Sequence, residues 1–111
     1  LGFSTSTIIN NVNAVFESLS GQISKKDFDF IGNNSFVKNE KPHPEIYNVT
    51  LEKLNLLKEE CLAIEDTEES SNAAVRAGVK CIAFPGEFHI DDQFKMCIKK
   101  MNSLDLSIFS L

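Results

Sequence analysis

The sequence has no apolar run long enough to cross a bilayer and no cluster of basic residues. A membrane-spanning helix needs roughly 20 consecutive apolar residues, and the apolar stretches of this chain are all much shorter. Its 11 Lys and Arg residues are scattered among 16 Asp and Glu residues, and the formal net charge is -5. Because nucleic acids are bound by clustered positive charge, we expect neither a nucleic acid nor a membrane as a partner.

Cysteine is also scarce, with three residues at Cys61, Cys81 and Cys97. Three thiols cannot pair completely, and none forms a C-x-x-C motif or a zinc-binding spacing with His43 or His89. Cys61 and Cys81 fall within apolar runs. We therefore predict buried, reduced thiols, as is typical of a cytoplasmic protein.

Repeats, low-complexity tracts and internal linkers are absent, and 111 residues with 42% hydrophobic content suit one compact domain rather than two. Strand-like and helix-like segments alternate along the chain. The patterns predict strands over 1–5, 28–32, 61–65 and 80–84, and helices over 8–19, 44–55, 67–77 and 94–101. The run 61–65 is apolar enough for a strand buried on both faces. This alternation predicts an α/β fold in which helices cover both faces of a parallel sheet.

Polar groups follow the predicted strands. In open parallel sheets, ligands bind beyond the carboxyl ends of the strands. Those ends carry Ser4 to Thr7, Gly32 to Asn34 with the loop to Lys41, then Glu65 with Asp66, and Pro85 to Phe88. We expect these segments to converge on one rim.

The residue types on this rim suit a phosphate and a metal ion. Glu65 and Asp66 would repel each other unless a cation lies nearby, and an oxygen-binding ion such as Mg2+ is the natural choice. Ser4 and Thr5 offer hydroxyls and backbone N–H groups at the start of a helix, which suits an anion. Lys41 supplies a compact positive charge for the same anion. Each residue alone has an ordinary structural explanation, so only the ordered set supports a site.

The segment that begins "KPHPEIY" at Lys41 and continues through "ECLAIEDT" resembles the second half of a haloacid dehalogenase (HAD) superfamily phosphohydrolase. Within that superfamily it is most similar to the β-phosphoglucomutase and CbbY-like branch. Lys41 matches the third motif of the family, Glu65 and Asp66 match the fourth, and "FSTST" matches the second with Ser4 as its hydroxyl residue. The resemblance covers nearly the whole chain and implies that residues 1–111 form part of a Rossmann-like, three-layer core that lacks its first strand.

The resemblance implies a Mg2+-dependent phosphatase or phosphomutase that acts on small phosphorylated metabolites, such as sugar phosphates. An aspartate nucleophile of a D-x-D motif on the first strand would attack phosphorus. Asp66 would bind Mg2+ with Glu65 in support, Lys41 would bridge the phosphoryl group and the nucleophile, and Ser4 with the Thr5 backbone would hold a phosphoryl oxygen.

This sequence departs from the family pattern at several points. Its one D-x-D string, Asp27 to Asp29, lies in the second strand unit, and the cap domain is absent. The loop that usually reads G-D-D reads "GNN" at 32–34, and Ser70 replaces a usual glycine. We therefore interpret the chain, which begins at Leu1, as the C-terminal portion of a longer enzyme and expect it to be inactive alone. The alternative is a non-catalytic interaction domain that has lost its nucleophile. A phosphoacceptor receiver domain is disfavoured because its acidic pair precedes its lysine.

The first strand of the resembled fold lies between the strand entering Ser4 and the strand ending at Glu65. Without it, both strands would have an unpaired edge, and such edges recruit other strands. We therefore expect either direct pairing of the two strands or a homo-oligomer formed through the unpaired edges, and we favour the oligomer.

Overall fold

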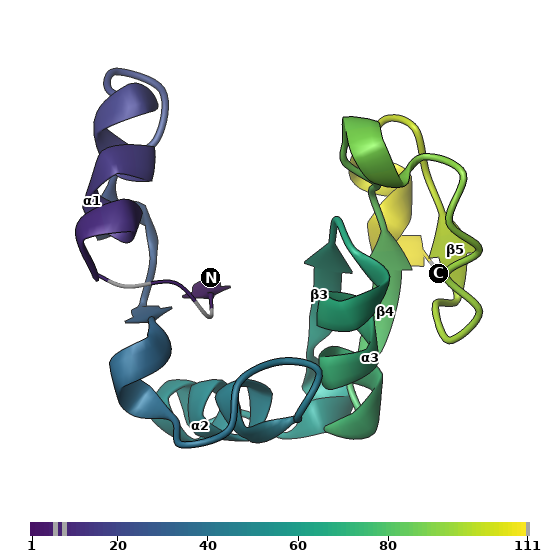
Figure 1. Ribbon diagram of the computed structural model, residues 1–111, viewed down its shortest axis with the longest axis horizontal. Coiled ribbons are helices and arrows are strands. Elements are labelled where there is room, and N and C mark those ends of the chain that lie inside the picture. The colour runs from purple at the N-terminus through teal and green to yellow at the C-terminus, as the bar shows by residue number, and fades with distance from the viewer. Residues whose placement is uncertain (6, 8, 111) are drawn as a thin grey trace.

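The computed structural model describes residues 1–5, 7 and 9–110, and their strands form two separate parallel sheets (Figure 1). In the first sheet β1 (Gly2–Ser4) pairs with β2 (Phe30–Gly32). The second sheet has the order β3 (Leu62–Glu65), β4 (Lys80–Ala83), β5 (Lys99–Lys100). The chain is thus an α/β protein with parallel strands, as the sequence predicts, but β1 and β3 do not pair with each other.

Three α-helices connect the strands: α1 (Ile9–Ser18), α2 (Glu45–Leu54) and α3 (Glu68–Arg76). Short 3-10 turns cover Lys25–Asp27, Asn34–Phe36, Lys58–Glu60, Glu87–His89 and Leu106–Ser110. None of the helices among the described residues is long and apolar enough to cross a membrane.

The molecule is U-shaped, with α2 across the base (Figure 1). We call the part with β1, α1 and β2 the N-terminal arm, and the part with β3, α3, β4 and β5 the C-terminal arm. Helix α2 packs on both. Thr50 and Leu54 lie against Gly2 of β1, whereas Tyr47 and Leu51 pack on the apolar cluster of the C-terminal arm. This helix therefore sets the spacing of the two sheets.

The N-terminal arm is built on the alternation of side chains along β1. Phe3 faces α1, where its ring makes edge-to-face contacts with Phe16 and Phe28 at centroid distances of 5.5 and 5.8 Å. Its neighbours Gly2 and Ser4 face α2 instead, since successive strand residues point to opposite faces. One helix thus covers each face of this sheet. The predicted contribution of Ile8 to α1 lies outside the described residues.

The C-terminal arm encloses a small core in which Ala63, Ala74, Val79 and Cys81 are buried. Helix α3 begins as predicted, because the Thr67 side chain accepts the N–H of Ser70 at 3.2 Å. The helix is followed by Gly78 in the left-handed region, with φ +87°. All three cysteines are free thiols, but Cys61 is only partly buried.

Two of the sequence predictions for the C-terminal arm are wrong. Residues 94–101 form no helix. The N–H groups of Ile98 and Met101 instead bond to the carbonyls of Cys81 and Ala83, at 2.9 and 2.8 Å, so this segment lies along the edge of β4. The buried backbone groups at the edge of β4 need hydrogen-bond partners, and this requirement overrides the helical spacing of apolar residues in the segment.

The second error concerns β3, which is not buried on both faces. Ala63 is 6% exposed, whereas Ile64, which points to the other face, is 42% exposed. An apolar run indicates a buried strand only where both faces and both edges are covered. Here β3 pairs with β4 alone among the described strands.

Candidate active site

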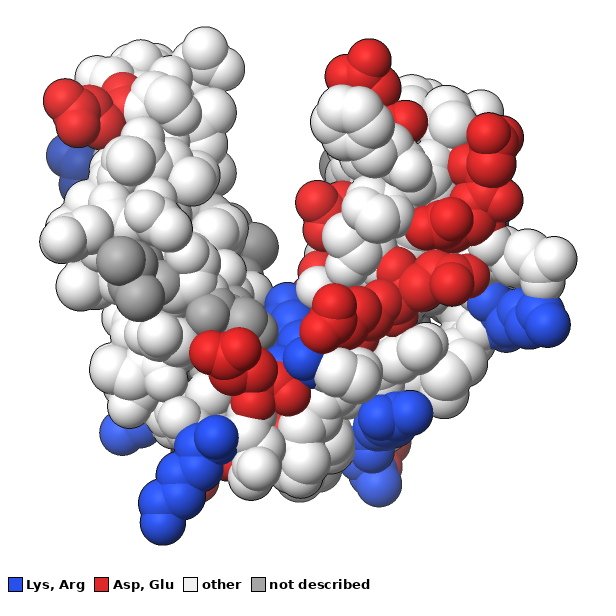
Figure 2. Space-filling model, in the orientation of Figure 1, with Lys and Arg blue, Asp and Glu red and all other residues white. Residues whose placement is uncertain are grey.

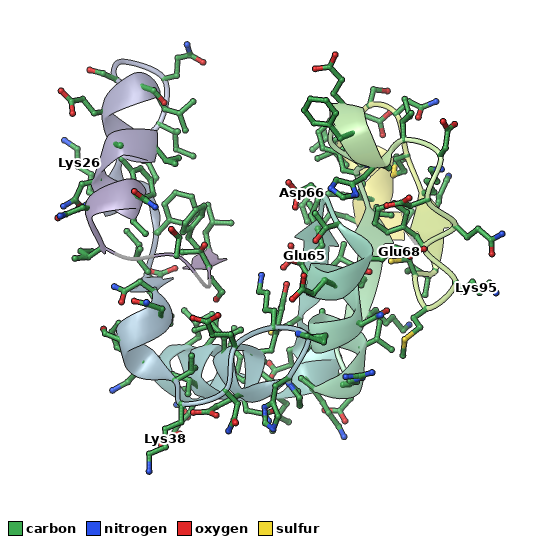
Figure 3. The ribbon with its side chains drawn as sticks, in the orientation of Figure 1. Lys26, Lys38, Glu65, Asp66, Glu68 and Lys95 are labelled. Carbon is green, nitrogen blue, oxygen red and sulfur yellow. The ribbon has the colours of Figure 1, made fainter. Side chains whose placement is uncertain are left out.

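A deep groove separates the two arms, with acidic side chains on the wall of the C-terminal arm and, at its base, a small basic patch flanked by acidic side chains (Figure 2). Glu65 and Asp66 lie at the carboxyl end of β3 on the side that faces the groove (Figure 3). The carboxyl end of β1 at Ser4 belongs to the opposite arm. The groove thus brings together two of the strand ends that the sequence predicts to converge.

Lys41 connects the two arms. Its Nζ donates to the Ser4 carbonyl oxygen at 3.3 Å and to Glu65 Oε1 at 3.0 Å. Both side chains are largely withdrawn from water, with 8% of the Lys41 and 11% of the Glu65 side chain exposed. An ion pair in such a site is only weakly screened by water and salt. The predicted site residues Ser4, Lys41 and Glu65 therefore form one contact chain.

The loop before α2 carries Lys41, and Glu45 holds this loop in place. The Glu45 carboxylate accepts the backbone N–H groups of Lys38 and Asn39 at 2.7 and 3.0 Å, and the Asn39 side chain at 2.9 Å. These hydrogen bonds to the charged form lower the pKa of Glu45. Glu45 is also the first residue of α2, where the helix dipole favours a negative charge.

Tyr47 of α2 is a member of the site that is not among the residues predicted from the sequence. Its hydroxyl donates to Glu65 Oε1, and Lys41 Nζ lies 5.5 Å from the centroid of its ring. Burial and, next, the negative charge of Glu65 raise the pKa of Tyr47. The sequence contains one signal for this role, a single tyrosine on an apolar helix face. A buried phenol needs a polar partner, so this tyrosine indicates a polar group close to the helix.

The Ser4 hydroxyl does not face the groove. It lies 2.5 Å from Thr50 Oγ1, which itself donates to the Ile46 carbonyl at 2.7 Å, so Ser4 is the donor to Thr50. The backbone N–H of Thr5 donates to the Gly32 carbonyl at 3.1 Å. Both groups that the sequence assigns to a phosphoryl oxygen are therefore bonded within the protein.

The Thr5 side chain is the hydroxyl that follows the end of β1. Its Oγ1 accepts the N–H of Thr7 at 3.2 Å, which leaves the hydroxyl proton as a donor. The neighbouring loop is fixed by the N–H of Asn34, which donates to the Thr7 carbonyl at 3.0 Å, and by the buried Asn33 side chain, which accepts the N–H of Ser35 at 2.9 Å. The "GNN" loop thus lies beside the end of β1.

Asp66 differs from Glu65 in its exposure. Its side chain is exposed, and its backbone carbonyl accepts the N–H of Gly86 at 3.3 Å, which places the loop after β4 beside it. The described residues contain no group of three His, Cys, Asp or Glu side chains that could hold a metal ion.

The D-x-D string of this chain lies far from these groups. The backbone N–H of Asp29 donates to the Leu1 carbonyl at 2.7 Å, which places it at the amino end of β1. Asp27 belongs to the exposed 3-10 turn that precedes β2. The described residues therefore place no aspartate pair of this motif at the carboxyl end of the sheets.

The chain is similar to known proteins in sequence and in fold. The sequence model of the haloacid dehalogenase-like hydrolases matches residues 1–84. The chain belongs to this family. Within it the chain is 33% identical, over 94 residues, to protein CbbY of Cereibacter sphaeroides. A second relative, the phosphorylated carbohydrates phosphatase of Thermotoga maritima, is 41% identical over 58 residues, which are 52% of this chain and 27% of that protein.

Solved structures of HAD hydrolases show the same fold. The crystal structure of CbbY from Rhodobacter sphaeroides in complex with phosphate superimposes with a TM-score of 0.86 and 31% identity over 93% of this chain. A β-phosphoglucomutase-like protein from Thermotoga maritima gives a TM-score of 0.76 at 28% identity, over 91% of this chain and 47% of that one. The chain therefore belongs to the CbbY and β-phosphoglucomutase branch of the HAD superfamily and has a Rossmann-like core. It spans 41% of the curated CbbY sequence and 46% of the CbbY crystal structure.

Proposed function

We propose that the complete protein is a phosphatase of small phosphorylated sugars and that residues 1–111 supply its Lys41, its acidic pair and one phosphate-binding hydroxyl. The observation that carries this proposal is the position of Lys41, a buried ammonium group held at the base of the groove by groups from both arms. Phosphoryl transfer demands mainly the positioning and neutralisation of charge. A lysine fixed in this way meets that demand.

Each group of the chain has a specific role in this proposal. Lys41 places a positive charge against a phosphoryl oxygen, where negative charge grows in the transition state. The Ser4 carbonyl and Glu65 hold its ammonium group in place. Thr5 donates its hydroxyl proton to a second phosphoryl oxygen. Ser4 therefore contributes through its backbone, because its hydroxyl is bonded to Thr50.

The chemistry of the acidic pair fits Mg2+. This ion binds through one or two carboxylates and fills its other positions with water and substrate phosphate, and Asp66 offers one exposed carboxylate beside the groove. Glu65 could support Asp66 through one carboxylate oxygen only, because its Oε1 is engaged by Lys41 and Tyr47. The bound ion would reduce the negative charge of the phosphoryl group.

The proposed aspartate nucleophile is not among the residues that surround the groove. Asp27 and Asp29 lie at the opposite end of the first sheet, so they cannot reach a phosphoryl group held by Lys41. We therefore expect residues 1–111 alone to show no turnover. The alternative, a non-catalytic interaction domain, rests on the same observation and requires that no other segment supplies a nucleophile.

The relatives support the proposed substrate class. One is a phosphatase of phosphorylated carbohydrates, and a CbbY structure contains xylulose-(1,5)bisphosphate. The positive charge exposed at the base of the groove is small, since only 8% of the Lys41 side chain is exposed, which favours a compact phosphate ester over a polyanion.

The test is the release of inorganic phosphate from a panel of sugar phosphates by the complete protein. Asp66→Asn should reduce turnover by at least about 100-fold, because one oxygen ligand loses its charge. Its thermal midpoint should match that of the wild type, since the Asp66 side chain is exposed. The matched control is Glu69→Gln, which removes an exposed charge in the first turn of α3. Unchanged turnover of the Asp66→Asn variant would exclude the proposed role of the acidic pair.

A further inference from the structure

Tyr47 contacts both members of the buried ion pair, each in a different way. Its hydroxyl donates to Glu65 Oε1, the same oxygen that accepts from Lys41 Nζ at 3.0 Å. The centroid of its ring lies 5.5 Å from the ammonium nitrogen of Lys41, within the range of a cation–π contact. A phenol that donates to an ionised carboxylate forms one of the stronger classes of hydrogen bond.

The packing around Tyr47 leaves its ring little freedom. It lies on the cluster formed by Ala63, Ala74, Val79 and Cys81, with Leu51 of α2 beside it. Rotation of the ring would require these close-packed side chains to move. The hydroxyl therefore approaches Glu65 from a fixed direction.

Two donors from different elements reach the same carboxylate oxygen. Lys41 comes from the loop before α2, and Tyr47 comes from the first turns of α2 itself. With one donor, the Glu65 carboxylate could turn about its last bond, whereas two fixed donors restrict it to one orientation. The orientation of Glu65 in turn limits where the Lys41 ammonium can lie.

Helix α2 also holds the other contact of Lys41. Thr50, one turn after Tyr47, accepts the Ser4 hydroxyl at 2.5 Å, and the Ser4 carbonyl accepts from Lys41 at 3.3 Å. The acceptors of Lys41 on both arms are thus positioned from one helix.

We propose that Tyr47 is a positioning residue of this site, whose hydroxyl fixes Glu65 and whose ring supports Lys41, so that the ammonium group faces the reacting phosphoryl group. This inference rests on the phosphatase function proposed above. It predicts that loss of the hydroxyl harms the chemical step more than substrate binding, because charge stabilisation in the transition state depends on the position of Lys41.

The first experiment measures kcat and KM of the complete protein for a sugar phosphate that the wild type hydrolyses. Tyr47→Phe keeps the ring and loses the hydroxyl, and we expect kcat to fall by about 10-fold to 100-fold with KM changed less than about 3-fold. Tyr47→Leu loses both contacts and should reduce kcat further. The matched control is Ser71→Ala, which removes a buried hydroxyl that bonds only to the Glu68 carbonyl among its described partners, and its kcat should equal that of the wild type. A Tyr47→Phe variant with wild-type kcat overturns the inference and leaves the proposed phosphatase function intact.

The second experiment does not depend on activity. Tyr47 is the single tyrosine of residues 1–111, which contain no tryptophan, so its ionisation can be followed by the absorbance of tyrosinate in this chain. Burial and, next, the negative charge of Glu65 raise the pKa of the Tyr47 phenol above its ordinary value, so Glu65→Gln should lower the pH at which the phenol ionises. The Cys81 and Cys97 thiols also face this cluster, but thiolates absorb at shorter wavelengths. Circular dichroism at each pH establishes that the chain is still folded.

The two experiments separate the two proposals. If the wild-type complete protein releases no phosphate from any sugar phosphate, the phosphatase function fails, and the titration decides whether Tyr47 holds Glu65. A midpoint that is the same in the wild type and in Glu65→Gln overturns the contact itself.

Discussion

At the scale of single residues, burial of the Lys41–Glu65 ion pair costs folding free energy, and the position of the pair in the candidate site explains why the protein contains it. Burial of two charges is expensive, and their attraction offsets this cost only where further hydrogen bonds satisfy both groups. The Ser4 carbonyl and the Tyr47 hydroxyl supply such bonds. The ion pair is therefore weak evidence that these residues stabilise the fold. It is better evidence that the Lys41 ammonium group is held in a fixed position.

The pair predicts a specific pattern of stability. Lys41→Met leaves the Glu65 carboxylate buried without its cation and should lower the free energy of unfolding by about 3 kcal/mol. The double variant Lys41→Met with Glu65→Gln removes both charges and should recover a third or more of that loss. Urea unfolding followed by circular dichroism measures both values.

Glu65→Gln alone completes this double-mutant cycle. Effects that simply add would show that the two groups are not coupled. If the ion pair were solvated in solution, the double variant would not recover part of the free energy of unfolding that Lys41→Met loses.

At the scale of elements, the boundaries of α2 and α3 follow from local chemistry. Asn55 ends α2 in the left-handed region with φ 54°, a conformation that asparagine tolerates better than most residues. Thr67 begins α3 through its side-chain hydrogen bond to Ser70, and Glu68 and Glu69 occupy the first turn. Both helix boundaries could be predicted because the residues that set each boundary lie within a few positions of each other in the sequence.

The N-cap of α3 provides a prediction at this scale. Thr67→Ala leaves the N–H of Ser70 without its side-chain acceptor and should lower the free energy of unfolding by about 1 kcal/mol. Thr67→Ser retains the oxygen and should lie within about 0.3 kcal/mol of the wild type. Thermal or urea unfolding of the three chains measures the difference, and equal losses for both variants would mean that the methyl group, not the cap, is responsible.

The segment 94–101 shows why other elements could not be predicted. Its apolar residues recur at helical spacing, but the edge of β4 needs hydrogen-bond partners, and the N–H groups of Ile98 and Met101 supply them. Glu68 also accepts the N–H of Phe94 at 2.7 Å, which holds the chain in a turn there. These partners lie 17 or more residues away in sequence, beyond the reach of a local pattern.

At the scale of the whole molecule, the U shape leaves two strand edges at the groove. In the described structure β1 pairs with β2 alone and β3 with β4 alone, so direct pairing of β1 with β3, one of the two outcomes the sequence allowed, does not occur. The exposed Ile64 lies on the same strand as Glu65. Unpaired backbone groups next to exposed apolar side chains favour the addition of a strand from another chain.

We therefore predict that the 111-residue chain self-associates through these edges. Light scattering at micromolar concentrations should show species larger than a monomer, with a mass that rises with concentration. Ile64→Lys places a charge beside the edge and should shift the equilibrium toward monomer, whereas Ile90→Lys, an exposed position in the loop after β4, should not. A monodisperse monomer with a cooperative melt would contradict the prediction.

The sequence by itself determined the fold class, the family and the identity of the charged groups. These depend on local periodicity, on caps such as Thr67, and on the spacing of Lys41 before Glu65 and Asp66. Only the tertiary structure decided what those groups contact. The Ser4 hydroxyl turns to Thr50, Tyr47 joins the ion pair, and residues 94–101 lie along β4. The physical reason is that a buried polar group takes the partner that packing brings to it, and that partner comes from a segment that is distant in the chain.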